Sequence, residues 1–179
     1  MDKIQPLVPA DARIFTAFLD SIRSDSGNQG IFFHPYGVDE PFDVDAVTQR
    51  NAERWARPMG HVGWQRAWGW FRDTRCVGQI HLTGGDVRSA LHRVNMGMSI
   101  HPDHRRQGGG RRLLQVAVTW ARAQPQIDWI DLGVFGGNDP AIALYRAFGF
   151  VEVGRTPDRF RVDGIALEDI AMCLSVAQG

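Results

Sequence analysis

The sequence predicts one α/β domain, of the mixed α+β kind, that spans residues 1–179. Helical and strand-like apolar patterns alternate from one end of the chain to the other, which is typical of a sheet covered by helices. At 179 residues and 44% hydrophobic content, the chain can bury one sizeable core but not two full ones. It contains no internal repeat and no low-complexity tract. We therefore expect one layered domain.

The N-terminal quarter predicts a strand followed by two helices. Ile4 to Val8 can form the strand, and a helix then begins at Pro9 or Ala10 and ends near residues 24–30. The residues expected on the inner face of this helix are Ile14, Phe18 and Ile22. Asp43 is suited to cap a second helix, because its short side chain can accept from free N–H groups. The apolar residues of this second helix are Val44, Val47 and Trp55.

The central part of the chain predicts three strands. Trp64 to Arg72 and Arg75 to Leu82 form an antiparallel pair around the tight turn Asp73-Thr74. Glycines at 84 and 85 end the second strand. Arg93 to Ile100 forms the third, with apolar residues at alternate positions.

The remaining third returns to alternation between helices and strands. A helix from about Gly109 to Ala123 and a strand from Trp129 to Phe135 are expected. The inner face of this helix would carry Leu113, Leu114, Ala117 and Trp120. Asn138 or Asp139 caps a short helix, and Gly149 suits the left-handed position after its end. Asp163-Gly164 then predicts a hairpin turn before a strand over Leu167 to Val176.

Composition narrows the function classes. The 20 basic and 20 acidic residues balance, so we expect no general binding to nucleic acid or to anionic membranes. No apolar run approaches a membrane span, and the first residues lack the apolar segment of a secretion signal, which favours a cytoplasmic protein. Cys76 and Cys173 lie in strand-like segments and are expected to be buried free thiols. No Cys/His spacing suggests a metal site.

The segment from His101 to Gly110 carries the strongest chemical signal. It reads His-Pro-Asp-His-Arg-Arg-Gln-Gly-Gly-Gly and connects a predicted strand to a predicted helix. Glycines let backbone N–H groups approach an anion closely, and the positive end of the helix faces it. Arginines at 105, 106, 111 and 112 add forked donors suited to phosphate oxygens. The segment predicts a phosphate-binding turn, and a solvated flexible turn is the alternative.

A second motif runs from Asn138 to Phe150 and reads Asn-Asp-Pro-Ala-Ile-Ala-Leu-Tyr-Arg-Ala-Phe-Gly-Phe. Taken alone, it is an ordinary helix in which Tyr145 is a core aromatic. Taken with residues 105–110, it resembles the GCN5-related N-acetyltransferase (GNAT) family, whose Arg/Gln-x-x-Gly-x-Gly/Ala signature precedes an Asn…Ala…Leu-Tyr…Gly-Phe signature by about thirty residues. The resemblance is strong over residues 93–150 and weak before residue 64.

The resemblance implies a fold, an activity and a cofactor. The fold is a mostly antiparallel mixed sheet of about seven strands, splayed between the fourth and fifth, with helices on both faces. The activity is transfer of an acyl group from acetyl-CoA to a primary amine by direct attack in a ternary complex, without a metal. In pattern the chain is most similar to ribosomal-protein N-terminal acetyltransferases and small-amine acetyltransferases. A strand-rich C-terminus often supports dimers in this family, so a homodimer is one expectation.

The resemblance also assigns residues to the coenzyme. The glycine-rich turn would hold the pyrophosphate, and the preceding strand would pair with the pantetheine arm as an added strand would. The implied coenzyme-binding residues are Met98, Ser99, Ile100, Arg105, Arg106, Gln107, Gly108, Gly109, Gly110, Arg111, Asn138 and Tyr145. Tyr145 would also protonate the departing thiolate, since a phenol and a thiolate have comparable basicity.

The general base is where the chain departs from the family pattern. The positions at which relatives carry a glutamate are Asn95 and Gly133 here. Asp131 lies on the same face of its strand as Gly133, and His81 in a neighbouring strand has a suitable ordinary pKa. A water chain that begins at Asn95 or Ser99 is a third alternative. Structural roles for Asp131 and His81 stay open as well.

The acceptor site is expected near the first two helices. The loop from Gly30 to Gly37 is rich in aromatic residues and glycine, and a long, partly apolar loop commonly has a function. Phe33, His34 and Tyr36 are the predicted acceptor contacts. Trp68 and Trp70, by contrast, are expected to be core residues.

Two other function classes compete with an N-acetyltransferase. One is a coenzyme-A-binding regulatory or sensor domain without catalysis, which the absent glutamates favour and Tyr145 disfavours. The other is a Rossmann-type dinucleotide protein, which the sequence disfavours because it lacks the G-x-G-x-x-G spacing after a first strand.

Overall fold

The computed structural model describes residues 2–37 and 39–177 and contains a seven-stranded sheet. The strand order is β1-β2-β3-β4-β5-β7-β6, and only β4 and β5 run parallel. The strands are β1 (Asp2–Pro6), β2 (Gln65–Arg72), β3 (Arg75–Gly84), β4 (Arg93–Ile100), β5 (Trp129–Phe135), β6 (Val151–Val162) and β7 (Ile165–Ser175). The predicted mixed, mostly antiparallel sheet is confirmed.

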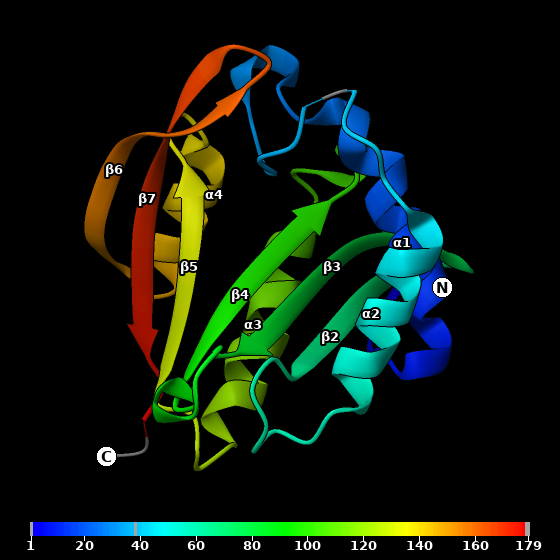
Figure 1. Ribbon diagram of the computed structural model, residues 1–179, viewed down its shortest axis with the longest axis vertical. Coiled ribbons are helices and arrows are strands. Elements are labelled where there is room, and N and C mark those ends of the chain that lie inside the picture. The colour runs from blue at the N-terminus through cyan, green and yellow to red at the C-terminus, as the bar shows by residue number, and fades with distance from the viewer. Residues whose placement is uncertain (1, 38, 178–179) are drawn as a thin grey trace.

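Helices cover both faces of the sheet, as predicted (Figure 1). Helices α1 (Ala12–Ile22) and α2 (Val44–Ala56) lie on one face, and α3 (Gly109–Arg122) and α4 (Asp139–Ala147) lie on the other. Short 3-10 helices cover Pro9–Asp11, Arg23–Asp25, Asn28–Gly30, Arg88–Ala90 and Pro102–His104. No helix among the described residues is both long and apolar enough to cross a membrane.

Local turn and cap chemistry follows the sequence. The Asp43 side chain accepts from the backbone N–H of Ala46 at 2.9 Å and so caps α2. Gly149 has the expected left-handed conformation after α4, with φ of 93°. Asp163 and Gly164 have φ of 49° and 82°, as a tight turn between β6 and β7 requires.

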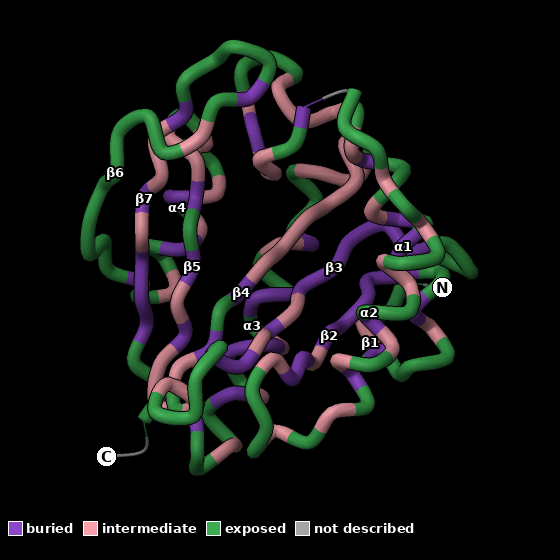
Figure 2. Tube along the Cα trace, in the orientation of Figure 1, coloured by how far each residue is buried: buried purple, intermediate pink, exposed green. Residues whose placement is uncertain are grey.

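Two apolar layers hold the helices to the sheet. The larger lies under α3 and α4 and includes Trp68 and Trp70, which are core residues as expected. The smaller lies under α1 and α2 and includes Phe15, Phe18 and Trp55. Figure 2 shows β2 and β3 largely buried and β4 mostly half-buried, whereas β6 at the sheet edge is exposed along most of its length.

The inner face of α1 and the bounds of the first strand differ from the prediction, whereas the state of the two cysteines agrees with it. Ile14 was expected on the inner face of α1 but is 46% exposed. The inner face is formed by Phe15, Phe18 and Ile22, and Ile14 points away from it toward solvent. The first strand occupies Asp2–Pro6 rather than residues 4–8, since it pairs with β2 and ends where Pro9 begins a 3-10 helix. The two cysteines are buried free thiols, as predicted.

The fourth and fifth strands separate along their length. They pair only where Arg93–Asn95 of β4 meets Trp129–Asp131 of β5. Beyond this point the backbones of the two strands diverge in a V (Figure 1), and we call the region between them the opening. The predicted splay is therefore present, and we call the last paired residues, Asn95 and Asp131, its closed end.

Candidate active site

The glycine-rich turn connects β4 to α3 at the side of the splay. Arg106 and Gly108 adopt left-handed backbone conformations with φ of 57° and 77°, and Gly108 caps α3. A Cβ atom at Gly108 would meet no heavy atom within 4 Å. The first N–H groups of a helix have no intrahelical partner. The start of α3 therefore faces open space with free donors, as an anion site requires.

The next two glycines serve packing. A Cβ atom at Gly109 would lie 2.1 Å from a ring carbon of Trp70, so only glycine lets α3 approach β2 this closely. A Cβ atom at Gly110 would lie 3.2 Å from Leu144 and 3.3 Å from Ile100. The three consecutive glycines thus meet three different local demands.

The arginines of the turn differ in how far they are engaged. Arg105 donates to the Ile100 carbonyl at 3.2 Å and forms an ion pair with Asp25 at 2.6 Å. Arg112 pairs with Asp2 at 2.9 Å. Arg106 is exposed and makes no polar contact with the rest of the described chain. Arg111 lies over the Phe148 ring, and the Gln107 side chain accepts from Arg72 at 2.6 Å.

The strand before the turn offers a free edge. Met98, Ser99 and Ile100 pair with β3 on one side and have no strand partner on the other, because β5 has already diverged. All three residues are half-buried. Their unpaired backbone groups can receive an extended chain in the manner of an added strand.

Helix α4 places the second motif across the splay. Asn138 precedes α4, and its side-chain amide donates to the Phe32 carbonyl at 3.5 Å. Tyr145 lies on the buried face of α4, with its ring 5.8 Å from that of Phe150. Burial raises the pKa of Tyr145 to about 12, so the phenol stays protonated at neutral pH. Its hydroxyl forms no hydrogen bond with another described residue, which leaves it available to a ligand.

The loop after α1 spans the open end of the splay. Phe32 packs with Val162 and Leu167 of the β6–β7 hairpin, whereas Phe33 lies under the Arg105 guanidinium at 5.3 Å. The loop therefore joins the two sides of the opening, as Figure 1 shows at the top of the molecule. Of the predicted acceptor contacts, Phe33 lies beside the glycine-rich turn.

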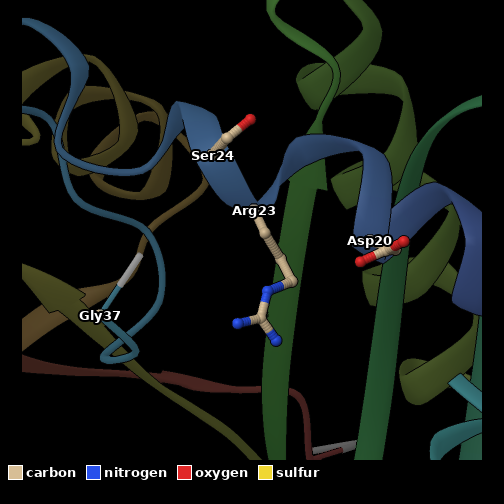
Figure 3. Close-up of a pocket in the computed structure, with 4 residues that line it drawn as sticks. All are labelled: Asp20, Arg23, Ser24 and Gly37. Carbon is tan, nitrogen blue, oxygen red and sulfur yellow. The ribbon is translucent and has the colours of Figure 1, made fainter. Parts of the chain in front are cut away.

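The other two predicted acceptor contacts lie further along this loop. The His34 ring contacts the Arg23 carbonyl through Nε2 at 3.0 Å, and burial lowers the His34 pKa. Tyr36 is 52% exposed and lies next to the His34 ring. A polar pocket of about 200 Å³ adjoins them, and the Arg23 side chain extends into it from the end of α1 (Figure 3). The residues that line it are Asp20, Arg23, Ser24 and Gly37.

Two of the three predicted base candidates lie near the closed end of the splay. Asp131 accepts from Arg93 with both oxygens, one of them at 2.8 Å. A carboxylate held by a forked guanidinium is a poor acceptor for a substrate proton, so this geometry disfavours Asp131. Asn95 is exposed and lies opposite Asp131 in the sheet. It is not ionisable and can act only through water.

His81 lies further along the opening, over β4. Its Nδ1 contacts Gln79 Oε1 at 3.0 Å, and Gln79 Nε2 donates to Ser99 Oγ at 3.0 Å. Because the glutamine amide donates to Ser99, its oxygen accepts from Nδ1–H and leaves Nε2 of His81 with a free lone pair. Burial, with a smaller effect of Arg54, lowers the pKa of His81 to about 4. The imidazole is therefore neutral at pH 7.

One carboxylate that the sequence analysis did not consider lies on the same face. Asp169 of β7 is half-buried, and its Oδ1 would lie 2.7 Å from a Cβ atom at Gly133. The pairing of Gly133 with Ala171 and of Phe135 with Asp169 places this side chain there. The alternation of side chains along β7 could have predicted on which face of the sheet Asp169 lies. Only the register between β5 and β7 shows that its side chain lies over Gly133. No cluster of three or more metal-ligating side chains occurs among the described residues.

The structure contains a splayed β4–β5 pair, a glycine-rich turn at a helix start and a buried tyrosine across the opening, which are the features that the resemblance assigned to a coenzyme site. The sequence matches the Acetyltransferase (GNAT) family over residues 32–150. The chain belongs to this family of acetyltransferases, and the resemblance drawn from its two motifs is confirmed. Nothing in this match supports the non-catalytic alternative.

Solved structures share the fold. A GNAT-family acetyltransferase from Streptococcus pneumoniae superposes with a TM-score of 0.80 at 20% identity, covering 98% of this chain and 99% of its own. A phosphinothricin acetyltransferase from Sinorhizobium meliloti, solved in complex with acetyl-CoA, gives 0.79 at 18% identity, with 99% and 90% coverage. A ribosomal-protein-alanine N-acetyltransferase from Brucella melitensis gives 0.75 at 20% identity, with 97% and 99% coverage. No curated protein matches the sequence significantly.

Proposed function

We propose that this protein transfers an acetyl group from acetyl-CoA to a primary amine, carried either by a small molecule or by a peptide. The observation that carries the proposal is the free edge of β4 leading directly into the glycine-rich start of α3. A donor-rich helix start and an unpaired strand edge suit a ligand with phosphates at one end and amide groups along its arm.

The residues at the turn fit the coenzyme. The open space at Gly108 leaves room for a pyrophosphate against the first N–H groups of α3. Arg106 is exposed and unengaged, and Arg105 lies at the same turn in an ion pair with Asp25. The backbone of Met98 to Ile100 would hold the pantetheine arm. When bound, acetyl-CoA supplies the activated acetyl group.

Tyr145 and Asn138 would act from the opposite side of the opening. The Tyr145 phenol keeps its proton at neutral pH and has no partner in the described chain, so we propose that it protonates the thiolate as coenzyme A departs. Asn138 is half-buried beside α4 and would contact the arm. The acceptor would enter beneath the loop that carries Phe33, His34 and Tyr36.

Binding and turnover test this function separately. Calorimetric titration of the parent protein with acetyl-CoA should show one site, and titration with NAD should show none. Release of free thiol should then require an amine from a panel of amines, amino acids, aminosugars and peptides. Coenzyme binding without thiol release across the panel would contradict the enzyme activity, and binding of NAD alone would contradict the coenzyme assignment.

A further inference from the structure

The opening between β4 and β5 begins with a glycine on each strand. Asn95 and Asp131 form the last pair, and the next residues on the same face are Gly97 and Gly133. With no side chain at either position, β4 and β5 do not themselves fill this level of the face that carries α1 and α2. The side chains of the outer neighbouring strands occupy the space above the two glycines.

Each glycine is covered by one titratable group. A Cβ atom at Gly97 would lie 2.6 Å from His81 Nε2, and one at Gly133 would lie 2.7 Å from Asp169 Oδ1. The imidazole comes from β3 and the carboxylate from β7, so they flank the opening from its two sides. A group placed between β4 and β5 on this face would lie between a neutral imidazole and a carboxylate.

Asp169 differs from the other carboxylates near the splay because it has no partner. Asp131 is held by Arg93, and Asp25 is held by Arg105. Asp169 forms no hydrogen bond or ion pair with any described residue. A carboxylate without a protein partner has both oxygens free to accept a hydrogen bond or a proton from a ligand.

The surroundings of Asp169 contain little charge. Its neighbours on the same face are Gly133 and Phe135 of β5, and Leu167 and Ala171 of β7, none of which titrates. Burial raises the pKa of the Asp169 carboxyl, and the positive charge of Arg159 on β6 offsets part of that effect. The group is thus a stronger base than an exposed aspartate.

We propose that Asp169 is the general base of the transfer and that it replaces, from β7, the glutamate that relatives carry at the position of Gly133. This inference rests on the proposed function. The ammonium N–H bond of the acceptor breaks, and its proton passes to Asp169 Oδ, directly or through one water. The neutral amine then forms the C–N bond with the acetyl carbonyl carbon as the C–S bond breaks.

The protons balance in this scheme. The thiolate takes the Tyr145 proton, and the nitrogen of the new amide loses its second proton to restore the phenol. The protonated Asp169 returns its proton to water. The net change is an ammonium ion and a thioester converted to an amide, a thiol and one released proton. His81 Nε2, across the opening, would accept a hydrogen bond from the amine and orient it.

The pH dependence of kcat/KM tests the role of Asp169. In the parent protein, kcat/KM for an alkyl amine should be nearly level from pH 7 to 9. In Asp169→Asn it should fall about 100- to 10,000-fold at pH 7, the range typical of a lost general base. It should then rise about tenfold per pH unit toward the pKa of the amine, because only the neutral fraction reacts.

Two further variants keep the test interpretable. Glu168→Gln removes the adjacent carboxylate, which pairs with Arg155 on the other face of β7, and should keep the parent pH profile. The double variant Asp169→Ala with Gly133→Glu moves the carboxylate to β5 and should restore a level profile. Thermal unfolding of each variant would show that it is folded, and titration with coenzyme A would show that it still binds the coenzyme.

The possible outcomes are distinct. An active parent with an unchanged profile in Asp169→Asn would overturn the role of Asp169 and leave the proposed function intact. A level profile that is lost in His81→Gln but kept in Asp169→Asn would assign the base to His81 instead. A parent protein that binds coenzyme A but acetylates no amine would overturn both proposals together.

Discussion

The two faces of the sheet at the splay are built in different ways. On the face of α3 and α4, β4 presents Val94, Met96 and Met98 to a dense apolar core. On the face of α1 and α2, the intervening residues are Asn95, Gly97 and Ser99, which are polar or lack a side chain. Because side chains alternate along a strand, β4 contributes to an apolar packed layer on one face and to a polar layer on the other.

The two faces therefore have different roles: one holds the elements in place, and the other gathers the titratable side chains. The packed face fixes the turn, α3 and α4 in place, and in the proposed function their backbone groups hold the coenzyme. The polar face gathers His81, Asp131 and Asp169 from three strands around the opening. We therefore expect substitutions on the packed face to affect stability and coenzyme binding, and substitutions on the polar face to affect turnover and pH dependence.

Gly109→Val should give the largest effect on the packed face. The added side chain would overlap the Trp70 ring, so we expect a loss of about 3 kcal/mol in the free energy of unfolding together with loss of coenzyme binding. Gly108→Ala is the matched control, because space is open there and the left-handed backbone should cost only about 1 kcal/mol. Urea unfolding and calorimetry would measure both. Equal stability of the two variants would contradict the packing role of Gly109.

Tyr145→Phe should separate chemistry from packing. The hydroxyl has no partner in the described chain, so coenzyme affinity and thermal stability should stay close to those of the parent. Turnover should fall about 10- to 1,000-fold as the proton donor is lost. Steady-state kinetics would measure the loss of turnover, and coenzyme titration would measure whether affinity is kept. Unchanged turnover would mean that solvent protonates the thiolate.

The half-buried imidazole of His81 should make stability depend on pH. Its pKa is about 4 when folded and near 6.5 when unfolded, so between these values the unfolded chain binds more protons. The free energy of unfolding should therefore fall by about 2 kcal/mol as the pH drops from 6.5 to 4. Urea unfolding of the parent and of His81→Gln would compare the slopes. Equal slopes in this window would show that His81 is not the group responsible.

The smallest effect is expected at Asp25, in the 3-10 helix that follows α1. Its ion pair with Arg105 competes with any phosphate for that guanidinium, so Asp25→Asn should tighten coenzyme binding by about two- to fivefold. Asp45→Asn removes an exposed partner of Arg13 at a remote site and should have no effect. Calorimetric titration compares them. Weaker binding in Asp25→Asn would instead show that Asp25 positions Arg105.

Local sequence patterns were sufficient for most of the fold. The cap at Asp43, the turn at Asp163-Gly164 and the left-handed Gly149 depend on neighbouring residues only, and each occurs where predicted. The two coenzyme motifs are also local, because a glycine-rich turn and a helix cap are contiguous in the chain. Family membership followed from these two segments.

Local sequence patterns could not predict the side-chain contacts on the polar face. Asp131 was a base candidate in the sequence, and only pairing with Arg93, 38 residues earlier, shows that its oxygens are engaged. The sequence does not indicate that Asp169 lies over Gly133, because this position depends on the register between β5 and β7.

The sequence by itself thus determined the elements, the order of the coenzyme motifs and the family, since these depend on residues close together in the chain. Only the tertiary structure decided which carboxylate lies free beside the opening. The reason is physical: pairing of charges and coverage of a glycine depend on distances between strands, and the alternation along one strand does not specify its neighbours.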